Sequence, residues 1–157
     1  GDSSSSSDVS SANYEMNEDA AAGDYVHKVT FAEKLAVIPA SSTIPDFSSI
    51  AEDLAAAEGF TWVHLKGQTT NNALESDSVD STNIAVVDSE GRKYSLSTDV
   101  TKYVESDVFP TYIEVQPSQT VQWEAYFQVP VDASGLKFYG NDLSFLPEFE
   151  VYVDLGL

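Results

Sequence analysis

The stretch TVQWEAYFQVP, Thr120–Pro130, constrains the fold most strongly because polar and apolar side chains alternate through almost all of it. The apolar positions fall on one face and are Val121, Trp123, Ala125, Phe127 and Val129. A helical repeat would scatter these positions, whereas a strand returns to the same face at every second residue. We therefore expect a β-strand with one buried and one solvated face, which is typical of antiparallel sheets.

Other stretches of the chain show the same period of two, separated by residues that favour turns. They are YVHKVTF from Tyr25, FTWVHLKGQTT from Phe60 and EFEVYVDLGL from Glu148. In the first of them, Phe31 is expected on the same face as His27 and Val29. NIAVVD from Asn83 is a further predicted strand. Many short strands with turn signals between them predict an all-β fold, an immunoglobulin-like antiparallel β-sandwich.

One short helix is expected at about 46–57, in the stretch DFSSIAEDLAAA. Phe47, Ile50 and Leu54 share one face at helical spacing. Ser49 and the glutamate three residues later have the spacing of a capping box. We expect this helix to lie against the edge or mouth of a sheet.

Residues 1–23 begin with GDSSSSSDVSSAN, which is rich in serine and nearly devoid of apolar side chains. Such a segment cannot bury enough apolar surface to offset the entropy lost on ordering. We predict a disordered Ser-rich leader or tether over residues 1–23 and a single immunoglobulin-like β-sandwich over residues 24–157. Leaders of this kind often follow the lipidated cysteine of exported lipoproteins.

The charge balance is strongly acidic, with 7 Lys and Arg against 26 Asp and Glu and a formal net charge of -19. Such a surface repels phosphate backbones and anionic lipid headgroups, so the sequence argues against nucleic-acid partners and direct membrane-surface binding. We expect membrane attachment only through a lipid anchor. Cysteine is absent, which excludes disulfides, thiolate metal sites and a cysteine nucleophile within the sequence.

The stretch AVVDSEGRKYSLS gathers four charged side chains, Asp88, Glu90, Arg92 and Lys93. Asp88 is able to hydrogen-bond the backbone of its own turn, and Gly91 suits a position with positive φ. We interpret the stretch as a hairpin that fixes strand register rather than as a chemical site.

The metal and cofactor candidates are few. His27 and His64 lie in two predicted strands and would share a face if those strands pair, but a metal site needs a third ligand. The loop ESDSVDS carries Glu75, Asp77 and Asp80, which are hard oxygen ligands of the kind that calcium prefers. The sequence indicates no cofactor, no catalytic residues and no enzymatic activity.

Aromatic residues are the stronger candidates for a binding surface. Trp62, Tyr126 and Tyr152 fall on the polar faces of their predicted strands, and Tyr126 and Tyr152 are expected on strands that could be neighbours. Outward aromatic side chains on a sheet form binding patches for protein or carbohydrate. The alternative is ordinary cross-strand packing, or burial of that face under a helix or a long loop.

The order of these segments resembles the telokin-like, immunoglobulin-fold domains of exported bacterial and archaeal lipoproteins of unknown function. That group is similar in fold to the mycobacterial secreted immunoprotective antigen. The segments that carry the resemblance are FTWVHLKGQTTNN, VVDSEGRKY, VQPSQTVQWEAYFQVP and FEVYVDL. The acidic loop NNALESDSVDS and the expected helix depart from the pattern. The resemblance implies fold and export, and no reaction.

Together these observations predict an exported, lipid-anchored cell-envelope domain that acts as a non-enzymatic protein- or ligand-binding module. Its expected partner is another envelope or extracellular protein. Two alternatives stay open. One is a calcium-dependent module that uses the Glu75–Asp80 loop, and the other is a structural surface spacer without a specific ligand.

Overall fold

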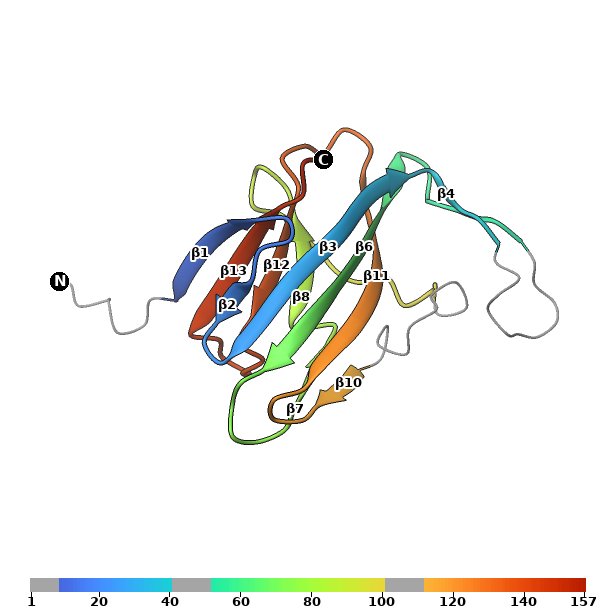
Figure 1. Cartoon of the computed structure of the whole chain (residues 1–157). Helices are drawn as coiled ribbons and strands as arrows, with labels where there is room; N and C mark the ends of the chain where they lie inside the picture. Colours follow the sequence, from blue (N-terminus) through green and yellow to red (C-terminus); the bar gives the residue numbers. More distant parts are fainter. Residues whose placement is uncertain (1–8, 41–51, 101–111) are drawn as a thin grey trace.

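The structure, a computed structural model, describes residues 9–40, 52–100 and 112–157 (Figure 1). Every regular element among these residues is a β-strand. The strands are β1 (Ser10–Glu15), β2 (Ala20–Ala22), β3 (Tyr25–Leu35), β4 (Val37–Ile38), β5 (Leu54–Ala55), β6 (Phe60–Asn71), β7 (Asp77–Asp80), β8 (Ile84–Val87), β9 (Lys93–Tyr94), β10 (Tyr112–Val115), β11 (Thr120–Pro130), β12 (Lys137–Asn141) and β13 (Phe149–Asp154).

Two sheets pack face to face (Figure 1). One has the strand order β1-β13-β12-β8-β9, and the other has the order β11-β6-β3-β2. Two small sheets, β10–β7 and β4–β5, complete the described part of the chain. The fold is an all-β sandwich, as the alternating pattern predicts.

The core forms where the apolar faces of the two sheets meet. All five predicted apolar positions of β11 are buried. Trp123 of β11 stacks on Phe138 of β12 with ring centroids 5.5 Å apart. Gly67 on the neighbouring strand β6 makes room for this indole, because a Cβ there would lie 2.6 Å from the Trp123 ring.

A β-bulge in β3 changes which residues face the core. The pairing of β3 with β6 shifts register between Val29 and Phe31. His27 and Val29 point inward and are fully buried, whereas Phe31 lies on the outer face and is exposed. The prediction that Phe31 shares a face with His27 is therefore wrong, since a bulge inserts one extra residue into a strand.

Residues 10–22 were expected within a disordered leader, and this part of the prediction is wrong. β1 pairs along its length with β13, and the pairing is parallel, so the sandwich is not wholly antiparallel. β2 pairs with β3 in the opposite sheet. Tyr14 packs against the core, and Ala20 and Ala22 are completely buried. Backbone pairing, together with core contacts of Tyr14, Met16, Ala20 and Ala22, thus orders a segment of low hydrophobicity. Residues 1–8 lie outside the described part.

The prediction of a helix at about 46–57 is also wrong for residues 52–57, the part of this range that the structure describes. Leu54–Ala55 forms β5, which pairs with β4. The two strands make an arm that extends from the sandwich (Figure 1). Leu54 packs in a cluster with Ile38, Trp62 and Tyr126, so tertiary burial outweighs the local helical spacing. Residues 46–51 lie outside the described ranges.

Within the described ranges no helix has the length and apolar character needed to cross a bilayer.

Candidate binding cleft

The outer face of the β8–β12–β13 sheet carries a row of aromatic and small apolar side chains. Phe138 of β12 lies in the core, and the core-facing side of Gly140 lies against His27, so Tyr139 between them points to the other face of the sheet. Tyr139 lies opposite Ala85 of β8 and Tyr152 of β13 in the strand register. The two tyrosine rings have centroids 5.6 Å apart. This row is continuous because the outward positions of adjacent strands lie side by side.

Charged groups hold the Tyr139 ring at its face and at its hydroxyl. The ammonium of Lys93 lies 3.8 Å from the ring centroid, within cation–π distance. The hydroxyl donates a hydrogen bond to Oε2 of Glu150 and accepts one from Nδ2 of Asn141. Burial and the hydrogen bond to Glu150 raise the pKa of Tyr139 well above its usual value. The hydroxyl thus bonds Glu150 and Asn141 while the ring face contacts Lys93, and these contacts hold the Tyr139 side chain in place.

The loop between β12 and β13 forms one wall of the site and is tied down by its own side chains. Oδ1 of Asn141 accepts from the Leu143 amide at 2.9 Å. The Asp142 carboxylate accepts from the amides of Ser144 (3.1 Å), Glu148 (3.0 Å) and Phe149 (3.2 Å). These bonds satisfy the amides on both sides of the loop tip.

Leu143 anchors this loop in an uncommon backbone conformation. Its φ is +65°, a region that residues other than glycine rarely adopt. The side chain is nevertheless buried against the core. The following Phe145 and Leu146 stand in solvent, with 97% and 77% of their surface exposed.

A cleft of about 590 Å³ lies between this loop and the β8–β9 hairpin. Its volume is in the range of small-molecule and peptide-side-chain sites. Its lining includes Ala85, Lys93, Ser95, Tyr139, Phe145 and Glu150. We call it the Tyr139 cleft. Tyr139 is only 4% exposed, so the accessible aromatic surface of the cleft comes chiefly from Phe145. One ammonium, one carboxylate and several hydroxyls lie beside it, which suits a ligand with both apolar and polar groups.

The aromatic patch predicted from the sequence is not an exposed surface. Trp62 and Tyr126 do lie on the outer face of their sheet, but they are only 1% and 5% exposed. The β4–β5 arm covers them, and the Trp62 indole donates to the Leu54 carbonyl at 3.1 Å. Tyr152 is half-buried on the opposite sheet, so it is not a neighbour of Tyr126. Only Tyr152, of the three, lies near the Tyr139 cleft.

The two histidines lie on opposite faces of paired strands, although β3 and β6 are neighbours. His27 is completely buried in the core. His64 is on the outer face, where its Nδ1 contacts Glu33 at 3.1 Å and its Nε2 contacts Glu124 at 2.7 Å. Its ring stacks on Tyr126 with centroids 4.2 Å apart. Each histidine is thus hydrogen-bonded separately, and the structure does not bring them together.

The acidic loop does not gather its carboxylates around one point. Asp77 accepts from the Ser78 amide and from the Tyr25 hydroxyl, which uses both of its oxygens. Asp80 accepts from the amide and hydroxyl of Thr82 within its own turn. In the ranges that the structure covers, no group of three or more His, Asp or Glu side chains has metal-binding geometry, Glu75 included.

The charged hairpin is a turn, as its sequence indicates. Gly91 has a φ of +84°, and β8 pairs with β9 on either side of the turn. The Asp88 carboxylate accepts from the amides of Glu90 and Arg92, the Arg92 guanidinium and the Tyr94 hydroxyl. Burial alone would raise the pKa of Asp88, but these hydrogen bonds outweigh it and hold the pKa well below its usual range.

Sequence reasoning missed most of the Tyr139 cleft. Tyr139 is visible as an outward aromatic in a short strand, and Lys93 as part of the hairpin. The loop DLSFLPEF offered one further signal, because adjacent apolar residues stand between an Asp and a Pro outside any alternating pattern. The contact between Lys93 and Tyr139 joins segments that are far apart in the sequence.

No protein-family model and no curated protein matches the chain. Solved structures do. The yjhA protein of Bacillus subtilis superposes with a TM-score of 0.62 at 9% identity, covering 90% of this chain and 98% of that one. An uncharacterized β-sandwich protein of Clostridium difficile 630 gives 0.53 at 12% identity, covering 94% and 96%.

A third similar structure is the ycdA protein of Bacillus subtilis, which is provisionally described as a lipoprotein. Its TM-score is 0.60 at 12% identity, and the match covers 89% of this chain and 39% of that one. At such identities these likenesses establish the fold alone. They agree with the all-β sandwich.

Proposed function

We propose that this chain is a non-enzymatic binding module of an exported cell-envelope protein, and that its ligand occupies the Tyr139 cleft. The observation that carries the proposal is the prebuilt cleft itself, with a sheet on one side and a hydrogen-bonded loop on the other. A site that is ordered before binding loses little conformational entropy when a ligand enters. The partner we expect is another envelope or extracellular protein.

The chemistry of the cleft favours binding over catalysis. Lys93 lies on the Tyr139 ring, and Glu150 accepts the hydrogen bond of the Tyr139 hydroxyl. A carboxylate in this position could act as a general base, but burial and this hydrogen bond raise the pKa of the Tyr139 hydroxyl, whereas activation of a nucleophile by its environment lowers it. The two charged groups of the cleft instead hold an aromatic side chain in place, which is a binding arrangement.

Attachment to the cell surface through a lipid anchor is part of the proposal. Its supports are the Ser-rich start of the sequence, the resemblance to telokin-like domains of exported lipoproteins, and the likeness to ycdA. Anionic lipids repel the acidic domain, and attachment through an anchor lets the domain stay at a distance from them.

A fragment screen by protein-observed NMR tests the binding site. Fragments that bear an aromatic ring and one charged group should shift the amide signals of residues 81–85, 93–96 and 139–150. Ser95 is exposed at the mouth of the cleft, so Ser95→Trp should block these shifts without unfolding the protein. Ser134→Trp places the same bulk at an exposed position outside the cleft and should leave them unchanged.

The proposal fails if no fragment shifts these signals in the wild-type protein. It also fails if the shifts persist unchanged in Ser95→Trp, because the ligand would then occupy another place.

A further inference from the structure

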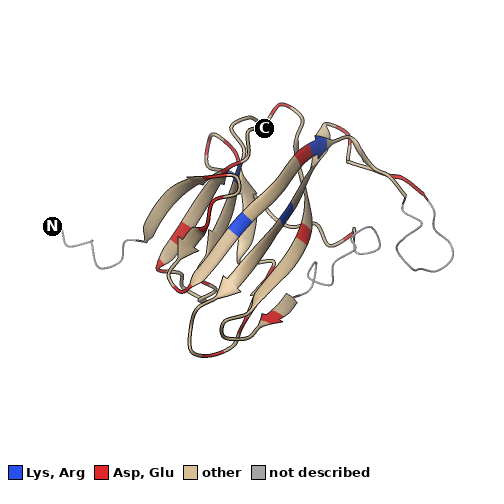
Figure 2. Cartoon of the chain, in the orientation of Figure 1, with Lys and Arg blue, Asp and Glu red and all other residues tan. Residues whose placement is uncertain are grey.

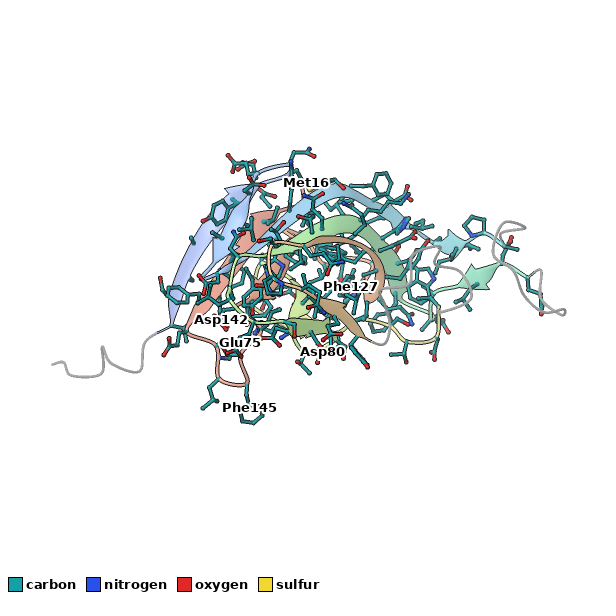
Figure 3. All side chains as sticks on the ribbon, turned by 60° about the horizontal axis from the view of Figure 1, so that its bottom comes forward. Met16, Glu75, Asp80, Phe127, Asp142 and Phe145 are labelled. Carbon is teal, nitrogen blue, oxygen red and sulfur yellow. The ribbon has the colours of Figure 1, made fainter. Side chains whose placement is uncertain are left out.

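Phe145 and Leu146 contribute little to the stability of the fold. They form adjacent apolar side chains at the tip of the β12–β13 loop, with 97% and 77% of their surface exposed. In the side-chain view Phe145 projects away from the body of the sandwich (Figure 3). Apolar side chains displayed together in this way mark interaction sites.

Hydrogen bonds and a buried side chain order the tip of the β12–β13 loop. The Asp142 carboxylate accepts three backbone amides, two of which come from Glu148 and Phe149 on the far side of the tip. The buried Leu143 side chain fixes the near side at a positive φ. An ordered loop presents its apolar anchors at a lower entropic cost than a flexible loop.

Acidic residues predominate in the loops around the tip, although Lys93 lines the same cleft as Phe145. The β2–β3 turn reaches this end of the sandwich, because Gly23 lies against Phe149 and Asp142. The β6–β7 loop joins them, since the Asn72 amide donates to the Asp24 carbonyl at 2.8 Å.

The described loops at this end span residues 23–24, 72–76, 81–83, 116–119 and 142–148, and these ranges contain no Lys or Arg. Their carboxylates are Asp24, Glu75, Asp142 and Glu148. Figure 2 shows red but no blue on the described loops at this end.

From these observations we infer that the β12–β13 loop docks into a cationic protein partner. Phe145 and Leu146 enter an apolar pocket of that partner, and Lys or Arg side chains around the pocket face the carboxylates of this end. The inference rests on the proposed function and names the class of its partner. Apolar side chains at the centre of an interface supply most of the affinity. Complementary charges at its edge set the orientation of the two partners.

A lipid surface fits the same tip less well. The carboxylates beside Phe145 would approach the headgroups together with the apolar pair, and anionic membranes repel them. Two apolar side chains also bury little area in a bilayer. Vesicle binding is therefore an outcome that counts against the inference.

The test uses a phage-displayed library of random 12-residue peptides selected against the immobilised full chain. Enriched peptides should combine apolar or aromatic residues with Lys or Arg. Their affinity should fall about 30-fold or more in the double variant Phe145→Ser/Leu146→Ser, as expected for anchor residues. It should also weaken as salt is raised and in Glu75→Gln/Glu148→Gln.

The matched control is Val131→Ser, which removes an exposed apolar side chain outside these loops and should change the affinity less than twofold. Because all substituted positions are exposed, thermal unfolding should confirm that each variant is folded.

Four results would overturn the inference. They are the absence of any enriched peptide, enrichment of acidic or uncharged peptides, affinity that is unchanged in Phe145→Ser/Leu146→Ser, and Phe145-dependent binding to phosphatidylcholine/phosphatidylglycerol vesicles. If fragments still bind the Tyr139 cleft, only the inferred class of partner is wrong. If fragments do not bind there either, both the partner class and the proposed function are wrong.

Discussion

At the scale of single residues, His27 links the two sheets through hydrogen bonds that a neutral ring satisfies. The Trp123 indole donates to Oγ1 of Thr69 at 3.0 Å, and that hydroxyl lies 2.9 Å from Nδ1 of His27. Nε2 of His27 lies 2.8 Å from the Asn141 carbonyl in the opposite sheet. One proton on Nε2 and one on the Thr69 hydroxyl complete the chain of donors and acceptors.

This buried ring predicts a loss of stability in mild acid. Burial lowers the pKa of His27 from its ordinary value of 6.5, although the hydrogen bond to Asn141 opposes the shift. Below pH 6.5 the His27 ring of the unfolded chain binds a proton, whereas the buried ring of the folded chain does not. The free energy of unfolding therefore decreases as the pH falls. The slope is at most about 1.4 kcal/mol per pH unit, and the contribution is complete above 6.5.

Urea unfolding between pH 5 and pH 8 measures this slope. His27→Gln keeps an amide near the position of Nε2 and cannot titrate, so the difference between the wild-type and variant curves isolates His27 from the carboxylates. The free energy of unfolding of the wild type should fall toward that of His27→Gln as the pH is lowered from 8 to 5. Parallel curves over the whole range would show that His27 is not a neutral, buried group.

The sequence predicted the orientation of most strand residues but not what covers them. The alternation of β11 and β6 correctly separates inward Trp123 from outward Trp62. It does not show that the β4–β5 arm buries Trp62, because that arm comes from a different part of the chain. His27 likewise looks like any alternating strand residue until Thr69 and Asn141 are placed beside it.

At the scale of elements, β1 shows how composition misleads. Its sequence SSANYE is polar, so burial alone would not order it. The strand is held by pairing with β13, including a hydrogen bond of 2.9 Å from the Ser10 amide to the Glu148 carbonyl. Backbone pairing leaves no hydrophobic signature in a sequence, which is why the predicted leader extended too far.

Hydrogen exchange tests the ordering of β1. Parallel strands bond alternate amides, so alternate amides of Ser10–Glu15 should exchange at least about 100-fold more slowly than in an unstructured peptide. The amides of β6, at the centre of the other sheet, provide an internal reference for full protection. Free exchange throughout Ser10–Glu15 would restore the flexible leader and remove β1 from the sandwich.

The structures of the β4–β5 arm and the β12–β13 loop could not be predicted from the local sequence pattern. Helical spacing around Leu54 is compatible with a short strand once β4 offers a partner. The β12–β13 loop depends on Asn141 and Asp142, whose side chains bond backbone amides up to seven residues ahead. Such side-chain bonds are decided by tertiary position and not by residue type alone.

At the scale of the whole molecule, the sandwich is a scaffold that presents an acidic, apolar-tipped end. A net charge of -19 gives the chain a field that attracts cationic partners and weakens with salt. The core joins the two sheets beneath that end through His27 and Asn141. Binding at this end therefore requires a loop that is as rigid as the strands that carry it.

Backbone ¹⁵N relaxation of the free protein measures this rigidity directly. For a prebuilt loop we expect order parameters near 0.85 at Ser144, Phe145, Leu146 and Glu148, equal to those of β12 and β13. Values below about 0.6 at the tip, with rigid strands beside it, would contradict a prebuilt binding site.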